Sequence, residues 1–580
     1  MYNTDYNFYE VVDSAEAYFA NHDKGKGSGW KGYQRWKHEN ESKYYPSGDR
    51  KNADHYLPAN QYKEIKKNQR LAFKGSFDNG WQELGPWNVN NVTSHYSPGI
   101  GRVETFWVNP SDSNHMYMGS RSGGFWRTTD GGANWENTTD FLVASGVFSI
   151  AVNPANSNEV LIAVQQGGNG YTHGIYKSTD GGKTWATTNF GPSKLGWIGL
   201  GDNEKIYKIA YHPTEAGYIY IGTTKGLFIS KTNLSTYTGI FTGRVTDIEF
   251  HPTKANIVYA YNNNGNDRNY LKKSIDYGDN FSNAGFLTIN NNAKLHIAVS
   301  PAAPNNVYLA STSGVWRSTN EGLSFSFRSN PDENCLGFAV SDEDVNYMVY
   351  GYVDTEASSD EGKTFDQVTK WSVQDAAYVH ADIRAAECIN GTFYMGTDGF
   401  LVKSNDNGTT WTILNNGTGI REFYAVGLCQ GNDQIQMLGS QDNGTSILSE
   451  NGWIEWNGGD GMEALVHPLN KNWMIGSWQY GSRNVTTNGG RTRVYSGNPE
   501  KGSEEASWEA PLLLNPLDHM KVYHFSDEMF EGANFGREWT LKGSPVLGQI
   551  IDAAIAENND KIIAIARYTA LNLTTDGGNT

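Results

Sequence analysis

One short pattern, repeated every 45 residues or so, constrains this fold more than any other feature of the sequence. Its clearest copy runs from Gly174 to Trp185 and reads GIYKSTDGGKTW, which fits the pattern S-x-D-x-G-x-T-W at each defined position. We call this unit the Asp box. Other clear copies cover residues 128–135 and begin at Ser274, Ser318, Ser358 and Ser404, with weaker ones near residues 230–237, 441–447, 486–492 and 526–530. So many copies at one spacing indicate a repeat architecture.

Each Asp box is preceded by two apolar segments joined by a turn that contains proline. Residues 150–154 read IAVNP and residues 160–164 read VLIAV, and similar pairs precede other boxes. The Asp of a box can accept hydrogen bonds from the amides of its own turn, and the Gly supplies a positive φ. Each unit therefore reads as four antiparallel strands with a tight turn between the third and the fourth, which is a β-propeller blade.

Counting the boxes gives eleven units, of which seven end near Ile420. We predict an all-β chain with a first, seven-bladed propeller over residues 81–420. Part of a second propeller follows over residues 421–580, truncated at the C-terminus because the last Asp box stops at Thr580, short of its aromatic residue. A single ring of about ten blades is the alternative. Residues 1–80 are a lead-in, with a short helix that ends near Asn21 followed by an extended, aromatic-rich segment.

Composition excludes several classes of function. The formal net charge of −17 argues against nucleic-acid binding, which needs a basic face. No run of about 20 apolar residues exists to span a membrane. The three cysteines, Cys335, Cys388 and Cys429, contain no CxxC pair, and no calcium-binding loop is recognisable, so we expect no metal and no cofactor. One disulfide or three free thiols both fit the cysteine positions.

With the repeats in place, the chain resembles sortilin-type BNR-repeat (Asp-box) β-propeller proteins. The resemblance rests on Gly101 to Trp135 and on five motifs between His380 and Asn488, which read HAD, TDG, QDNG, GGDG and QYG. Residues 29–48 are also similar to a lead-in found on proteins exported by the type IX secretion system. This likeness implies a secreted or cell-surface protein whose signal peptide has been removed, with a C-terminal sorting domain beyond Thr580 that engages the secretion machinery.

Propeller geometry gathers the polar residues of these motifs on one face. The innermost strand of each blade begins on this face, and the loop between the second and third strands lies on it. We call this face the loop face. The Asp boxes lie on the opposite face. The candidate ligand-binding residues are His380, Asp382, Asp398, Arg421, Glu422, Gln479 and Tyr480, and the candidate catalytic residues are Asp442 and Asp460. Alternatively, Asp398, Asp442 and Asp460 are turn residues, since each lies close to a glycine.

Two functions follow from this placement. The first is binding of a glycan, peptide or partner protein, with a polysaccharide or a surface protein as the ligand. The second is inverting glycoside hydrolysis, which needs two carboxyl groups about 6.5–9.5 Å apart. The chain is similar to two-propeller xyloglucan hydrolases, whose first blade carries a catalytic Asp in a D-x-G-G context. Here that position is Ser122, in SRSGG, and a hydroxyl cannot replace a carboxylate. Binding is therefore the favoured function.

Overall fold

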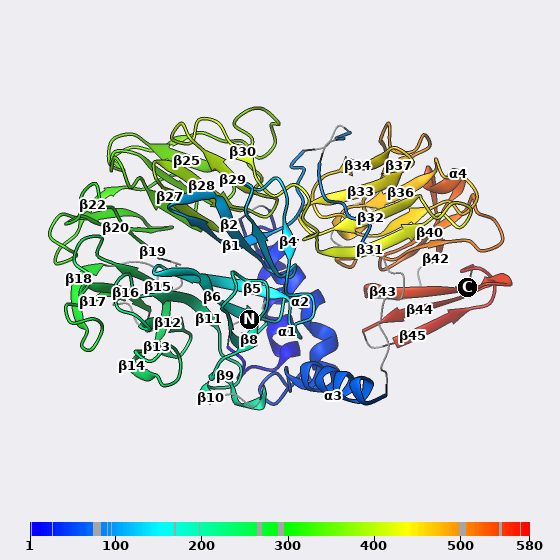
Figure 1. The fold of residues 1–580 in the computed structure, drawn as a ribbon. Helices are drawn as coiled ribbons and strands as arrows, with labels where there is room; N and C mark the ends of the chain where they lie inside the picture. The colour runs from blue at the N-terminus through cyan, green and yellow to red at the C-terminus, as the bar shows by residue number, and fades with distance from the viewer. Residues whose placement is uncertain are drawn as a thin grey trace. The chain divides into compact units, whose positions relative to one another are not determined.

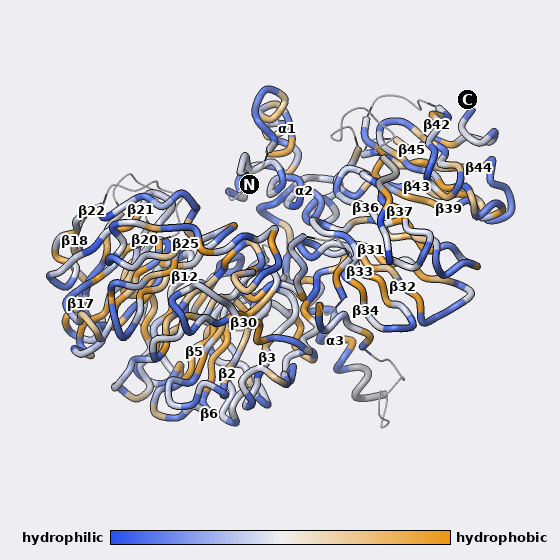
Figure 2. The backbone as a smooth tube through the Cα atoms, turned by 90° about the horizontal axis from the view of Figure 1, so that it is seen from above, coloured by the Kyte–Doolittle hydropathy of each residue, from blue (hydrophilic) through white to orange (hydrophobic). Residues whose placement is uncertain are grey.

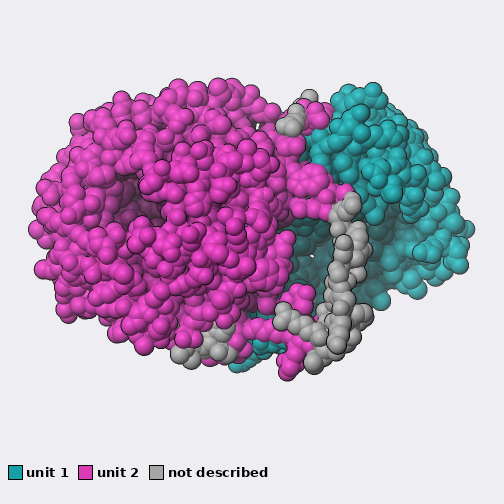
Figure 3. All heavy atoms as spheres, viewed as in Figure 1, with its two compact units in different colours: residues 1–61, 423–580 teal, residues 62–422 magenta. Residues whose placement is uncertain are grey.

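The structure is a computed structural model. It describes residues 1, 3–25, 27–72, 83–89, 91–93, 96–167, 170–195, 198–263, 269–287, 295–497, 506–543, 548–568 and 570–579. Within these ranges the secondary structure is mainly β, with ten four-stranded antiparallel sheets, one three-stranded sheet and one two-stranded parallel pair. The predicted all-β propeller fold is confirmed. The chain divides into two compact units, residues 62–422 (unit 2) and residues 1–61 with 423–580 (unit 1), which Figure 3 colours separately.

Unit 2 contains seven four-stranded sheets, each made from consecutive strands of the chain (Figure 1). Their strands are β1 Val103–Asn109, β2 Asp112–Ser120, β3 Phe125–Thr128 and β4 Glu136–Asn137; β5 Gly146–Asn153, β6 Asn156–Gln165, β7 Thr172–Ser178 and β8 Ala186–Thr187; β11 Ile206–Tyr211, β12 Ile219–Thr223, β13 Gly226–Ser230 and β14 Thr238–Thr242; β15 Arg244–Phe250, β16 Val258–Asn263, β17 Asn269–Ser274 and β18 Ser282–Leu287; β19 His296–Val299, β20 Val307–Ser311, β21 Gly314–Ser318 and β22 Ser326–Ser329; β23 Gly337–Val340, β24 Met348–Gly351, β25 Thr355–Ser358 and β26 Asp366–Gln367; and β27 Ala385–Ile389, β28 Thr392–Gly396, β29 Leu401–Ser404 and β30 Thr412–Ile413. Between the second and third sheets, β9 Phe190–Pro192 and β10 Ile198–Leu200 form a small parallel pair beside the 3-10 turn Ser193–Leu195.

The seven sheets of unit 2 close into a ring. The first strand of each sheet contacts the first strand of the next, from β1 through β5, β11, β15, β19 and β23 to β27, and β1 in turn contacts β27 and β28. Backbone hydrogen bonds seal this junction, with the Val103 amide donating to the Thr397 carbonyl at 2.8 Å and the Ile100 amide to the Gly399 carbonyl at 3.0 Å. A buried cluster that includes Phe106 and Phe393 fills the space between these two sheets. Unit 2 is thus a complete seven-bladed propeller.

Unit 1 contains four further sheets and the amino-terminal helices. The sheets are built from β31 Phe423–Leu428, β32 Gln436–Ser440, β33 Gly444–Ser449 and β34 Gly452–Asn457; β35 Ala464–Val466, β36 Met474–Ser477, β37 Arg483–Thr486 and β38 Val494–Gly497; β39 Leu512–Leu514, β40 Val522–Phe525, β41 Met529–Gly532 and β42 Glu538–Gly543; and β43 Ile550–Ala556, β44 Asn559–Arg567 and β45 Ala570–Thr574. A 3-10 turn covers Gln479–Gly481, and α4 covers Ala533–Gly536. In both units the hydrophobic residues gather along the strands and the connecting turns are hydrophilic (Figure 2).

The lead-in is more helical than the sequence indicated. Helix α1 Phe8–Phe19 matches the expected apolar face, but the segment predicted to be extended forms α2 Trp30–Tyr44 and α3 Leu57–Ala72 instead. The aromatic residues of α2 explain this difference. Trp30, Tyr33 and Trp36 share one face of the helix and pack against α1, where they are buried. This tertiary packing outweighs the poor helix propensity of aromatic and β-branched side chains.

The Asp boxes hold their turns as predicted. In the box at Asp180, the carboxylate accepts the amides of Lys183 at 3.1 Å and Thr184 at 2.9 Å and the hydroxyl of Ser178 at 2.8 Å. Gly182 has a φ of 76°, which a residue with a Cβ adopts only with strain. Trp185 packs edge-on against Phe125 of the neighbouring sheet. The box therefore closes a hairpin and joins two blades, which is a structural role.

These turns make the fold sensitive to acid. Hydrogen bonds from Asn134 and Thr128 lower the pKa of Asp130 to about 2. At Asp180, burial raises the pKa, but bonds from Thr184 and Ser178 outweigh it and the value again falls to about 2. Because the folded pKa lies below the unfolded one, this stability is present above about pH 4 and is lost as pH falls towards 2. We expect the urea midpoint to drop between pH 4 and pH 2, and the Asp180→Asn variant to drop less steeply. Parallel slopes in the two proteins would contradict this.

Candidate functional site

The two candidate catalytic residues lie together in unit 1. Asp442 occupies the turn between β32 and β33, and Asp460 the connection between β34 and β35. An Oδ1 atom of Asp460 accepts the Asp442 backbone amide at 2.8 Å, which ties the two turns to each other. The Asp442 side chain is 15% exposed and that of Asp460 is fully buried. The structure thus places these two candidate residues together at one edge of neighbouring sheets.

Both carboxylates are ion-paired to helix α2. One nitrogen of the Arg35 guanidinium, Nη2, contacts Oδ1 of Asp442 at 2.5 Å and also contacts Oδ1 of Asp460. Lys31, one turn earlier on the same face of the helix, lies 2.7 Å from Oδ2 of Asp460. Burial disfavours the charge on Arg35, but the two aspartates outweigh it and hold the pKa of Arg35 well above its usual value. We call these four residues the α2–aspartate site.

Neighbouring polar and aromatic side chains complete the α2–aspartate site. Gln479 donates to Oδ2 of Asp460 at 2.6 Å, so this predicted ligand-binding residue does join the cluster. Gln441 donates to Oδ2 of Asp442 at 3.3 Å. The Arg35 guanidinium lies 6.0 Å from the centre of the Trp508 ring, and Tyr480 packs edge-on against the same ring. Arg35 is therefore held by two charges and one aromatic face.

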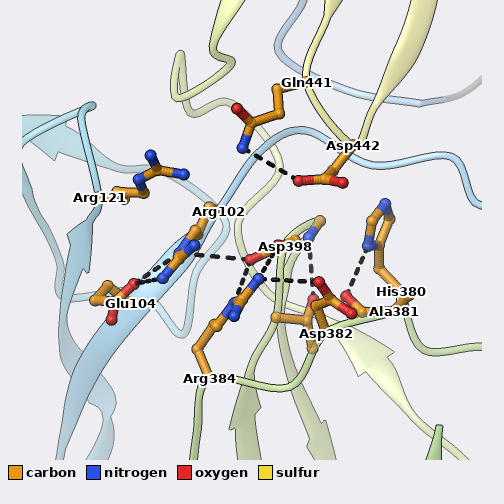
Figure 4. A network of polar contacts seen from close by, with 12 residues as sticks. Arg102, Glu104, Arg121, His380, Ala381, Asp382, Arg384, Asp398, Gln441 and Asp442 are labelled. Atoms are coloured by element: carbon orange, nitrogen blue, oxygen red, sulfur yellow. Dashed lines mark hydrogen bonds and ion pairs between the residues drawn. The ribbon is translucent and has the colours of Figure 1, made fainter. Parts of the chain in front are cut away.

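Asp398 and Asp382 belong to a separate network in unit 2 (Figure 4). Arg384 donates through Nε to Oδ1 of Asp398 at 2.7 Å and through Nη2 to Oδ2 of Asp382 at 3.0 Å. Arg102 lies 3.5 Å from the same Oδ1 of Asp398 and donates to Glu104 at 2.7 Å. The Asp398 side chain is only 1% exposed. This carboxylate is a fixed partner of two arginines from the first and last sheets of the ring.

The remaining predicted residues of unit 2 are each bonded elsewhere. The His380 ring bonds the Ala381 carbonyl through Nδ1 at 3.0 Å. Arg421 donates to the Gly99 carbonyl. Glu422 accepts the hydroxyl of Ser122 and lies 3.6 Å from the Arg121 guanidinium. These contacts tie the loops of the face together, so His380 and Arg421 contribute to its structure.

The sequence-based prediction did not include the arginine and lysine side chains that pair with the candidate aspartates. Arg35 and Lys31 lie in the segment predicted to be extended, although their i, i+4 spacing opposite an aromatic face is a helical signal. Arg384 and Arg102 stand directly before innermost strands, which places them on the loop face beside the predicted acids. An acidic pair that is buried requires compensating positive charge, and searching for that charge would have found them.

Other site classes receive no support. The three cysteines are free thiols, two of them buried, so the structure forms no disulfide. In the part of the chain that is described, no group of His, Cys, Asp and Glu side chains is arranged to hold a metal. None of the described helices combines the length and the apolar character that crossing a bilayer would require.

Comparison with known proteins identifies relatives of both the sequence and the fold. Residues 90–357 match the family described as sortilin, neurotensin receptor 3. A xyloglucanase from a Paenibacillus species is 31% identical over 151 residues, which cover 22% of this chain and 14% of the relative. A probable oligoxyloglucan-reducing end-specific xyloglucanase from Neosartorya fischeri is 27% identical over 138 residues, covering 22% and 15%. The chain thus matches only a small part of these curated relatives.

Two solved structures share the architecture at 14% identity, a level that shows the fold alone. The GH74 xyloglucanase from Xanthomonas campestris aligns with a TM-score of 0.61, covering 84% of this chain and 80% of its own. PorZ from Porphyromonas gingivalis, described as an essential bacterial surface component of the type-IX secretion system, aligns with a TM-score of 0.51, covering 82% and 64%. The predicted resemblance to sortilin-type Asp-box propellers is confirmed over residues 90–357, and the chain is a β-propeller protein with local sequence similarity to xyloglucanases.

Proposed function

We propose that this protein is a secreted or cell-surface propeller that binds a glycan, peptide or partner protein on its loop face. One observation carries the proposal: the candidate carboxylates Asp398, Asp442 and Asp460 are all ion-paired to arginine. A glycoside hydrolase needs one carboxyl group that stays protonated and can give up its proton. A nearby cation favours the ionised form instead. Paired in this way, the aspartates serve as structural anchors.

The experiment that tests this proposal separates binding from hydrolysis. The protein and its Asp442→Asn variant are incubated with xyloglucan and other β-glucans, and the release of reducing ends is measured beside a known xyloglucanase. We expect no release above the no-enzyme blank from either protein. In parallel, arrays of immobilised glycans and peptides are probed with the same proteins. Hydrolysis that Asp442→Asn abolishes would overturn the proposal, as would failure to retain any ligand on the arrays.

Inverting hydrolysis is the second candidate function, and Glu422 favours it. Ser122 stands where the xyloglucanase resemblance expects an acid, but its hydroxyl is bonded to Glu422, which brings a carboxylate to that position. The Glu422 side chain is 21% exposed, in contrast to the buried Asp398 and Asp460. If the protein hydrolyses any glucan, Glu422→Gln should reduce the rate at least about 100-fold, as expected for loss of an acid or base.

Export by the type IX system is part of the proposal. It rests on the resemblance of residues 29–48 to the lead-in of exported proteins, and the likeness of fold to PorZ is consistent with it. Immunodetection of the protein in medium, surface and periplasmic fractions tests the location. Retention in the periplasm when the secretion machinery is disrupted is the expected result, and unchanged release would contradict it.

A further inference from the structure

The innermost strands of unit 2 begin with cations at four of the seven sheets. Arg102 precedes β1, Lys205 precedes β11, Arg244 begins β15 and Arg384 precedes β27. Since these first strands contact one another around the ring, their starting ends surround one mouth of the central channel. The interaction of Arg102 and Arg384 with the same Asp398 side chain shows that the starting ends of the first and seventh sheets do meet there.

The four cations differ in how they are neutralised. Arg102 and Arg384 are bonded to Glu104, Asp382 and Asp398, as described above. Lys205 and Arg244, on the adjacent third and fourth sheets, form no ion pair with any carboxylate in the described part of the chain. The Arg244 guanidinium instead lies 4.8 Å from the centre of the Tyr207 ring. This half of the mouth therefore carries positive charge without matching acid.

The backbone of Lys205 is fixed on both sides at the start of β11. Its backbone amide donates to the hydroxyl of Thr224 at 3.0 Å, and its carbonyl accepts the Thr224 amide at 3.0 Å. Burial, together with the charges of Arg244 and Arg121, lowers the pKa of Lys205 to about 8, and Glu104 opposes this only in part. Crowded cations of this kind are stabilised by a bound anion.

The interior of the channel restricts such an anion to the mouth. Further along the same strands, Lys208 lies 3.7 Å from Asp247 and 3.6 Å from Glu249, so its charge is already matched. Glu387 adds another acid on β27, and burial raises its pKa. Carboxyl groups thus line the channel below the cationic mouth, and Lys208 among them is already paired, so it offers an anion no comparable site.

We propose that this cationic mouth, formed by Lys205 and Arg244, binds the carboxylates of an acidic polysaccharide. The inference rests on the proposed function and adds the class of ligand. With a net charge of −17, the protein repels polyanions in general, so any binding must come from a local site such as this one. Arginine forks pair with carboxylates, and the Tyr207 ring beside Arg244 suits the apolar face of a sugar ring.

The test is calorimetric titration of the intact protein with three probes of similar length, which are oligogalacturonate, neutral cello-oligosaccharide and oligoglutamate. We expect oligogalacturonate to bind, and the double variant Lys205→Gln/Arg244→Gln to weaken it at least about tenfold. Lys363→Gln, which removes an exposed lysine in an Asp box of the same unit, is the matched control and should bind as the parent does. Thermal unfolding of each variant checks that the fold is intact.

A pH series provides a readout that a structural role would not give. Binding should weaken as pH rises from 7 to 9, because Lys205 then loses its charge. Lys205→Arg should retain binding and remove this pH dependence. Equal binding of oligoglutamate or of the neutral oligosaccharide would overturn the ligand class and leave the proposed function standing. Undiminished binding by the double variant would overturn the site. Absence of binding to all three probes would overturn the inference, whereas the arrays described above test the proposed function separately.

Discussion

Replacing Arg35 with methionine is expected to lower the free energy of unfolding of unit 1 by about 3–5 kcal/mol, the cost of removing one partner from a buried ion pair. Without the guanidinium, the fully buried Asp460 keeps only Lys31 as a cationic partner, and Lys31 is itself 48% exposed. Asp442 loses its closest contact. Methionine preserves most of the apolar stem of the side chain, so the decrease in the free energy of unfolding reports the loss of the charge.

The measurement is urea denaturation followed by tryptophan fluorescence. Lys51→Met is the matched control from the same lead-in, since Lys51 pairs with Asp5 across 3.4 Å and both side chains are 70% exposed. Its effect should stay within about 0.5 kcal/mol, as is usual for surface pairs. If Arg35→Met unfolds at the same urea concentration as Lys51→Met, pairing with α2 does not stabilise the two aspartates. A structural role for Asp442 and Asp460 would then be contradicted.

Replacing Arg483 with methionine should destabilise unit 1 to a similar degree. Arg483, at the start of β37, has no exposed surface. It donates to the carbonyls of Ala510 at 2.9 Å and Pro511 at 3.1 Å, and it lies 2.8 Å from Nδ1 of His524. Burial and the charge of Arg483 lower the pKa of His524 well below its usual value, so the ring is neutral and Nδ1 accepts. The variant leaves several buried acceptors without this donor, at about 1–3 kcal/mol each.

The same denaturation assay tests this variant, with Arg491→Met as its control. Arg491 lies in the exposed Asp-box turn that follows β37 and, among the described residues, donates only to the Asn488 carbonyl at 3.0 Å. Its removal should change the midpoint little. In Arg483→Met, the pKa of His524 should also rise towards its ordinary value, which NMR titration can follow. A midpoint equal to that of Arg491→Met, with the His524 titration unchanged, would show that the buried acceptors find other donors.

The sequence predicted the repeating part of this fold well, and the reason is physical. Local interactions determine the structure of an Asp box, since the Asp180 carboxylate accepts hydrogen bonds from amides within four residues and Gly182 supplies the positive φ. A motif whose bonds are local can be recognised without knowing the rest of the chain. The same locality explains why the strand–turn–strand segments at residues 150–164 gave the sheet order correctly.

The candidate site was less predictable because its bonds join distant residues. The positions of Asp442 and Asp460 followed from the blade pattern, but their partner Arg35 lies 407 and 425 residues away in the chain. No local sequence pattern indicates a pairing between residues so far apart in the chain. The helix that carries Arg35 was predicted to be an extended segment. Trp30, Tyr33 and Trp36 are individually poor helix formers, and packing against α1 stabilises them in the helix.

The order in which the chain is synthesised gives the α2–aspartate site a further consequence. Each blade of unit 2 forms from contiguous residues, so it can fold as it leaves the ribosome. Helix α2 is made among the first residues, yet the acids that neutralise Arg35 and Lys31 appear only after the whole of unit 2. During that interval the cationic face of the helix remains open to other anionic partners. Unit 1 therefore assembles late, and it does so by recruiting the earliest part of the chain.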